Sequence, residues 1–87
     1  MTKTIFTQEY QLFLRHLRDS RQHVGLTQEQ LAVRLNQTQS FISKCERGDR
    51  RIDVIELRAF CLALEIPLEK FISQLEEIIS NQSQEEL

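Results

Sequence analysis

The sequence predicts an all-α domain built from five short helices. Its 87 residues include two glycines and one proline, too few for the many turns of an all-β protein. Gln, Leu, Glu, Arg and Ile dominate the composition, which favours helix. Apolar residues recur at helical spacing in successive stretches, and capping or turn residues separate these stretches. A chain of this length forms one domain with a thin core.

The first predicted helix covers about residues 8–23 and is capped by Thr7. Gly25 stands just past its end, where a left-handed residue is favoured. Residues 1–6, ahead of the cap, are expected to form a flexible arm. The apolar stripe of this helix contains Tyr10, Phe13, Leu14 and Leu17.

The second and third helices are short and closely connected. Thr27 opens the second helix, and Gln30, three residues later, completes a capping box. Asn36 follows this helix and suits a left-handed turn. Thr38 caps the third helix, which covers about 39–47 and ends at Gly48. The inward-facing side chains are Leu31, Ala32 and Leu35 on the second helix and Ile42 and Cys45 on the third.

Two further helices complete the domain. Asp53 and Glu56 form a second capping box at the start of the fourth helix, and Pro67 starts the fifth. The domain is therefore expected to span 7–79, followed by a polar acidic tail at 80–87. The apolar positions are Leu57, Phe60, Cys61 and Leu64 on the fourth helix, then Leu68, Phe71, Leu75, Ile78 and Ile79 on the fifth.

The formal net charge of −2 hides an uneven distribution. Residues 1–64 hold ten basic and seven acidic side chains, a balance of +3. Residues 65–87 hold one basic and six acidic side chains, a balance of −5. A basic body with an acidic end is typical of a nucleic-acid-binding unit followed by a segment that stays away from phosphates.

The segment 27–48 carries the functional signal. A three-residue turn, Asn36 to Thr38, joins its two capped helices, so they must cross at a steep angle. The second helix of the pair then projects from the domain and is held by one side only. Its outer side offers side chains that hydrogen-bond base edges: Gln39, Ser40, Ser43 and Lys44. With no acidic residue at its outer N-terminal positions, this helix can approach phosphates with its positive end first.

The chain resembles the phage-repressor-like (Xre-type) helix-turn-helix regulators over roughly residues 12–75. The resemblance rests on LRHLRDSRQHVGLTQEQLA, QSFISKCERGDRR and DVIELRAFCLALEIPLEKF. It implies a compact five-helix domain whose second and third helices read DNA. It also implies that Arg21 and Glu46 pair and so fix the reading helix in position. The implied base-reading residues are Gln39, Ser40, Ser43 and Lys44, and the implied phosphate contacts are Gln28, Thr38, Arg50 and Arg51.

Three positions depart from the family pattern. Asn36 stands where glycine is common, Ile52 where proline is common, and Glu65 where the fourth helix usually ends in glycine. Asn36 tolerates the left-handed conformation, whereas Glu65 costs about 1 kcal/mol or more if it adopts it. None of the three lies on the expected reading surface.

Some of these residues also fit other interpretations. The polar side chains on the outer side of the third helix are also typical of an ordinary solvent-exposed helix face with no ligand. Cys45 and Cys61 are expected to be small buried hydrophobes, with a redox or metal pair as the alternative. No grouping of residues indicates a nucleophile with its base, a phosphate loop or a metal site, so we expect no enzyme, cofactor or metal. With no signal segment or membrane-length apolar run, a cytoplasmic protein is expected.

The sequence therefore predicts a sequence-specific regulator that binds double-stranded DNA, most simply a stand-alone repressor of the phage, mobile-element, restriction–modification or antitoxin type. The alternative is a helical protein-interaction module of the same fold that no longer reads DNA. A palindromic operator and a homodimer are expected, with Leu75, Ile78 and Ile79 at the interface. In the alternative arrangement, this half of the fifth helix folds back on Tyr10 and Phe13. No small-molecule ligand is expected.

Overall fold

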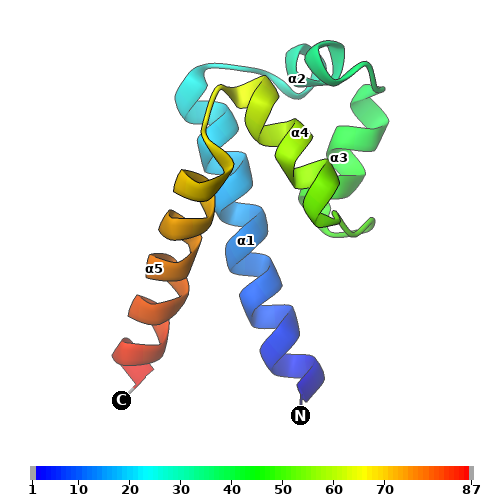
Figure 1. Ribbon diagram of the computed structural model, residues 1–87. Coiled ribbons are helices and arrows are strands. Elements are labelled where there is room, and N and C mark those ends of the chain that lie inside the picture. The colour runs from blue at the N-terminus through cyan, green and yellow to red at the C-terminus, as the bar shows by residue number, and fades with distance from the viewer. Residues whose placement is uncertain (1, 87) are drawn as a thin grey trace.

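The computed structural model describes the backbone of residues 2–86 and the side chains of residues 8–82. The described chain forms five helices and no strand, which confirms the predicted all-α class. The helices are α1 (Thr2–Val24), α2 (Gln28–Leu35), α3 (Gln39–Arg47), α4 (Val54–Leu64) and α5 (Leu68–Glu86). The two long helices, α1 and α5, run antiparallel and bring both termini to one end of the molecule (Figure 1).

The outer ends of the long helices differ from the sequence expectation. α1 begins at Thr2 rather than after a cap at Thr7, and no glycine or proline interrupts this stretch. α5 continues to Glu86, through the polar segment expected to be a tail. The Ser80 hydroxyl lies 3.2 Å from a Glu76 carboxylate oxygen, one turn earlier in α5. Met1 and Leu87 lie outside the described residues.

The core draws side chains from all five helices. Helix α2 packs against α3 and α4, α1 packs against α3, α4 and α5, and α5 also packs against α4. Most of the buried positions are those that the apolar stripes predicted. They are Phe13, Leu14, Leu17, Leu31, Ala32, Ile42, Cys45, Leu57, Phe60, Cys61, Leu64 and Phe71.

The helix ends follow the predicted capping chemistry. Thr27 and Asp53 each form a complete capping box. Asn36 and Glu65 end α2 and α4 in the left-handed conformation, with φ of 56° and 61°. Gly48 ends α3 with φ of 84°, and a Cβ there would lie 3.1 Å from Leu14 Cδ1. Glycine at 48 therefore serves both the turn and the close packing of α3 on α1.

The structure explains why isoleucine is accommodated at position 52. The backbone N–H of Ile52 donates a hydrogen bond to the Tyr10 hydroxyl at 3.0 Å. Proline has no N–H and would lose this bond. The bond ties the loop before α4 to α1.

Candidate nucleic-acid interface

The helix pair α2 and α3 presents the predicted reading surface. The hydroxyl of Thr38 accepts a hydrogen bond from the Phe41 N–H, and Gly48 closes the other end of α3. Ile42 and Cys45 are fully buried, so they hold the inner side of the helix against the core. The predicted base-reading residues lie elsewhere on α3: Gln39, Ser40 and Lys44 are exposed, and Ser43 is half-buried.

Beneath this surface the structure brings Arg21 and Glu46 together. Arg21 Nε and Nη2 donate to the two carboxylate oxygens of Glu46 at 2.7 and 3.1 Å. Arg21 Nη1 also donates to the Leu26 carbonyl oxygen at 2.7 Å. The side chains of Arg21 and Glu46 are only 9% and 4% exposed. This bidentate pair joins the end of α1 to the end of α3 and to the turn before α2.

A chain of hydrogen bonds continues from this pair to the surface. Gln28 Nε2 donates to Glu46 Oε1 at 3.0 Å, and Gln39 Nε2 lies 3.4 Å from Gln28 Oε1. Gln28 thus links the buried carboxylate of Glu46 to an exposed amide at the start of α3. The Gln39 amide is therefore directed toward Gln28. Sequence reasoning placed Gln28 and Gln39 on the surface without revealing that they touch.

The two candidate phosphate residues after α3 are held by neighbouring side chains. Arg50 donates to both carboxylate oxygens of Glu56, at 3.1 and 2.7 Å, and its guanidinium lies 4.8 Å from the Phe41 ring centroid. The hydrogen bond from Arg50 lowers the pKa of Glu56, and the same contact raises the pKa of Arg50. Arg51 lies over the Tyr10 ring, 4.6 Å from its centroid. Both cationic side chains are therefore ordered by aromatic rings of the domain itself.

Arg47 is a further residue of this surface that the sequence interpretation did not select. It is exposed at the end of α3, and its guanidinium hydrogen-bonds the Ser43 hydroxyl and Asp49. Its four-residue spacing from Ser43 is a signal that could have revealed the contact. Arg47 occupies one of the hydrogen-bonding sites of Ser43.

The cysteines lie inside the core, as their positions predicted. Cys45 and Cys61 are both buried and free. Burial raises the pKa of each thiol, and in Cys45 the nearby Arg50 opposes part of that rise. Within the described residues, no group of three or more His, Cys, Asp or Glu side chains is placed to hold a metal ion.

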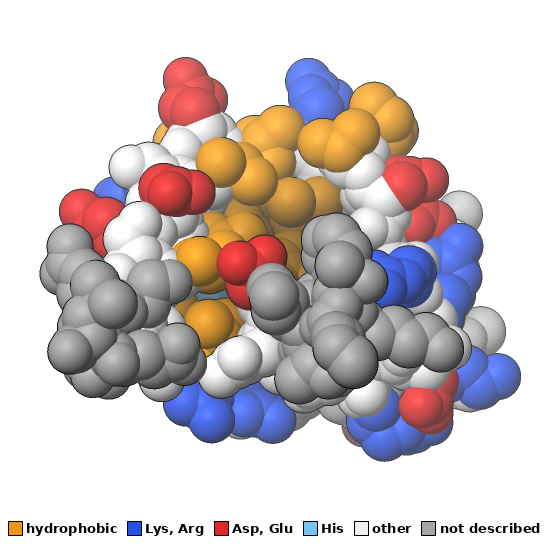
Figure 2. Space-filling model, turned by 90° about the horizontal axis from the view of Figure 1, so that it is seen from below, with side chains coloured by type: hydrophobic (Ala, Val, Ile, Leu, Met, Phe, Trp, Pro, Cys, Tyr) orange, Lys and Arg blue, Asp and Glu red, His pale blue; other side chains and the backbone are white. Residues whose placement is uncertain are grey.

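The candidate dimer residues lie on α5. Leu75 packs against the core cluster that contains Phe13, while Ile78 and Ile79 are half-buried. Ile72, on the same helix, is 42% exposed. Figure 2 shows apolar side chains around a hollow at the end of the molecule where the termini lie.

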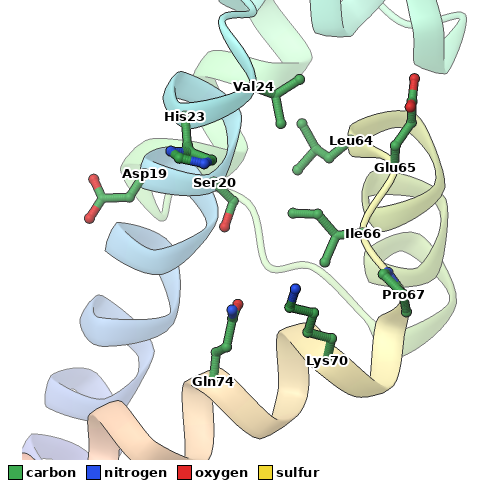
Figure 3. Close-up of a pocket in the computed structure, with 10 residues that line it drawn as sticks. All are labelled: Asp19, Ser20, His23, Val24, Leu64, Glu65, Ile66, Pro67, Lys70 and Gln74. Atoms are coloured by element: carbon green, nitrogen blue, oxygen red, sulfur yellow. The ribbon is translucent and has the colours of Figure 1, made fainter.

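A separate hollow of about 460 Å³ lies between the end of α1, the α4–α5 turn and α5. Ser20, Lys70 and Gln74 point into it, beside Leu64 and Ile66 (Figure 3). None of its lining residues belongs to α2 or α3, so it takes no part in the surface described above. None of the described helices has the length and apolar character to cross a membrane.

The two short capped helices α2 and α3, joined by a three-residue turn, form a helix-turn-helix arrangement. Residues 17–71 match the helix-turn-helix family model, and the chain belongs to this family in its Xre-type form. Among solved structures, an XRE-family like protein from Pseudomonas syringae pv. tomato str. DC3000 is 43% identical, with a TM-score of 0.83. The match covers 88% of this chain and 94% of that one. No curated protein matches significantly. The chain is thus of the DNA-binding transcription-regulator class.

Proposed function

We propose that this protein is a sequence-specific repressor that inserts α3 into the major groove of double-stranded DNA. The observation that carries the proposal is the chain of contacts from Arg21 and Glu46 through Gln28 to Gln39. A base-reading side chain discriminates best when its orientation is fixed before binding, because less conformational entropy is then lost.

The chemistry of the exposed side chains suits base edges. An oriented Gln39 amide can donate to adenine N7 and accept from its N6 amino group, while Lys44 donates to guanine. Ser40 and Ser43 can pair with either kind of group. Thr38 and Gln28, at the N-terminal ends of α3 and α2, lie where helix dipoles favour a phosphate. Arg50 and Arg51 would contact the phosphate backbone from the loop that follows α3.

We further propose that the protein acts as a homodimer on a palindromic operator in the cytoplasm. A single nine-residue reading helix covers too few base pairs to select one site in a genome. Two copies related by a two-fold axis read half-sites about 34 Å apart. The apolar hollow seen in Figure 2, the exposed side chain of Ile72 and the half-buried side chains of Ile78 and Ile79 support α5 as the interface. Leu75, the third residue expected there, packs against the core instead.

Selection from random duplex DNA tests the proposal. The parent protein should enrich a two-fold symmetric motif, and its affinity should fall steeply with added salt because phosphate contacts release counterions. An enriched motif without two-fold symmetry would reject the palindromic operator. If no motif is enriched and salt has no effect on affinity, the chain is instead an interaction module that keeps the fold without reading DNA.

A further inference from the structure

A polar groove runs along α1 beside the C-terminal half of α3. Its volume is about 210 Å³, and one wall carries the donor side chains of Gln8, Gln11, Arg15 and Arg18. These four positions are three or four residues apart, so their side chains share one face of α1. Glu46 of α3 contributes to the opposite wall.

The two arginines of the groove are available to an anion. Arg15 and Arg18 are both exposed, and neither forms an ion pair within the part of the chain that the structure describes. The arginines that do form ion pairs there are Arg21, Arg34, Arg47 and Arg50.

The acidic residue in the groove does not satisfy these cations. The Glu46 side chain is 4% exposed, and both of its carboxylate oxygens accept hydrogen bonds from Arg21. Its Oε1 also accepts from Gln28. The negative charge of Glu46 is therefore compensated by the guanidinium of Arg21, and the wall of the groove formed by α1 remains cationic.

The position of Glu46 also places the groove next to the reading surface. Glu46 contacts Gln28, which contacts Gln39, so the groove adjoins the start of α2 and the side of α3 that carries the base-reading residues. Positions three residues apart on a helix, such as 15 and 18, are separated by about 4.5 Å along its axis. Successive phosphates of one strand are spaced about 3.4 Å along the duplex axis, so Arg15 and Arg18 can address neighbouring phosphates.

We propose that this groove binds the phosphate backbone of DNA beside the base pairs that α3 reads. Arg15 and Arg18 supply the charge, and Gln8 and Gln11 supply neutral hydrogen bonds. Phosphate contacts fix register and orientation without carrying sequence information, so α1 would set the position of α3 along the groove of the duplex. The assignment rests on the proposed DNA binding and adds α1 to its contact surface.

The test compares two double variants of equal net charge. Arg15→Gln/Arg18→Gln removes the groove cations, while Arg58→Gln/Lys70→Gln removes two exposed cations of α4 and α5 that form no ion pair in the described structure. Affinity for the selected operator and for random duplex is measured between about 50 and 200 mM salt. Thermal melts establish that both variants fold.

The groove variant should bind both DNAs more weakly than the parent. The slope of the logarithm of its binding constant against the logarithm of the salt concentration should be shallower by about 0.9 for each phosphate that the protein no longer neutralises. The control variant should keep the slope of the parent. Ethylation interference should reveal phosphates beside each half-site that matter for the parent and not for the groove variant. Equal slopes for the two variants would overturn the groove assignment while leaving DNA binding intact. Absence of salt-dependent binding by the parent would instead reject the proposed function itself.

Discussion

At the scale of single residues, Gln39 is the side chain on which sequence discrimination should depend most. Gln39→Ala should weaken binding to the selected operator by about 1–3 kcal/mol and binding to random duplex much less, because a bidentate base contact is specific. Gln37→Ala, an exposed glutamine in the preceding turn, is the matched control and should leave the ratio unchanged. Equal losses on both DNAs for Gln39→Ala would mean that Gln39 does not read a base. Competition binding with the two duplexes gives the ratio directly.

Glu46 should be the most sensitive charged residue for stability. Glu46→Ala leaves the guanidinium of Arg21, whose side chain is 9% exposed, without its carboxylate partner. Stranding one member of a buried ion pair costs about 3–5 kcal/mol of unfolding free energy. Glu29→Ala, an exposed acid on α2, is the control and should change the unfolding free energy by less than about 0.5 kcal/mol. Thermal melts that show no difference between the two variants would contradict a structural role for the pair.

At the scale of elements, the contact between α1 and α5 contains a titratable group. The His16 ring stacks on Phe71 with centroids 4.2 Å apart, and its Nε2 is buried without a hydrogen-bond partner in the described structure. Burial lowers the pKa of His16 below 6.5, although the charge of Asp19 opposes part of the shift. The unfolded chain therefore binds a proton more readily than the folded one. Stability contributed by neutral His16 is present above the unfolded pKa and is lost as pH falls through 6.5 towards the folded pKa.

The lowered pKa of His16 predicts that the thermal midpoint of the parent falls between about pH 7.5 and pH 5.5. His16→Phe keeps an aromatic ring on Phe71 and removes the titration, so its midpoint should fall less over the same interval. His23→Phe is the control, because His23 is exposed, and it should retain the pH dependence of the parent. Parallel pH profiles for the parent and His16→Phe would show that another group is responsible.

The C-terminal helix should control association. Ile72→Glu/Ile79→Glu places charges on the proposed interface and leaves Leu75, which packs on the core, in place. By sedimentation, the parent should be dimeric at micromolar concentration and this variant a folded monomer with weaker operator binding. Val54→Glu/Leu62→Glu, on exposed positions of α4, is the control and should remain dimeric. A variant of α5 that stays dimeric would remove this helix from the interface.

Whether a helix boundary or a contact could be predicted from the sequence depends on whether the interactions that determine it are local or long-range. Caps such as Thr27 and Asp53 depend on neighbours within one turn, so the inner helix boundaries were predictable. The outer ends of α1 and α5 were not, because a polar segment without glycine or proline has no local stop signal. Contacts between residues far apart in the sequence could not be predicted from the spacing of residues along a helix. The contact of Arg51 with the Tyr10 ring, for example, depends on how the loop after α3 lies against α1. The Arg21–Glu46 pair was expected only through family resemblance, since 25 residues separate the two.

At the scale of the whole molecule, the charge distribution favours one orientation on approach to DNA. The positive balance of residues 1–64 includes the groove arginines and the cations of α3 and the following loop, while acidic side chains accumulate on α5. A duplex attracts the first part and repels the second, so encounter should occur with α5 turned away from phosphates. This polarity agrees with an interface between copies on α5 and a reading surface on α2 and α3.

The burial of Cys45 on the inner side of α3 makes this thiol a native reporter of whether the reading helix leaves the core. A thiol that is fully buried and has a raised pKa reacts with an alkylating reagent only when its surroundings open. In a Cys61→Ala background, the alkylation rate of Cys45 should follow the global unfolding equilibrium. Operator at 100 times its dissociation constant should slow alkylation about 100-fold, because DNA binds the closed form only. Alkylation of the free protein that is much faster than global unfolding allows would instead reveal that α3 opens on its own, exchanging between docked and undocked positions while the rest of the domain stays folded.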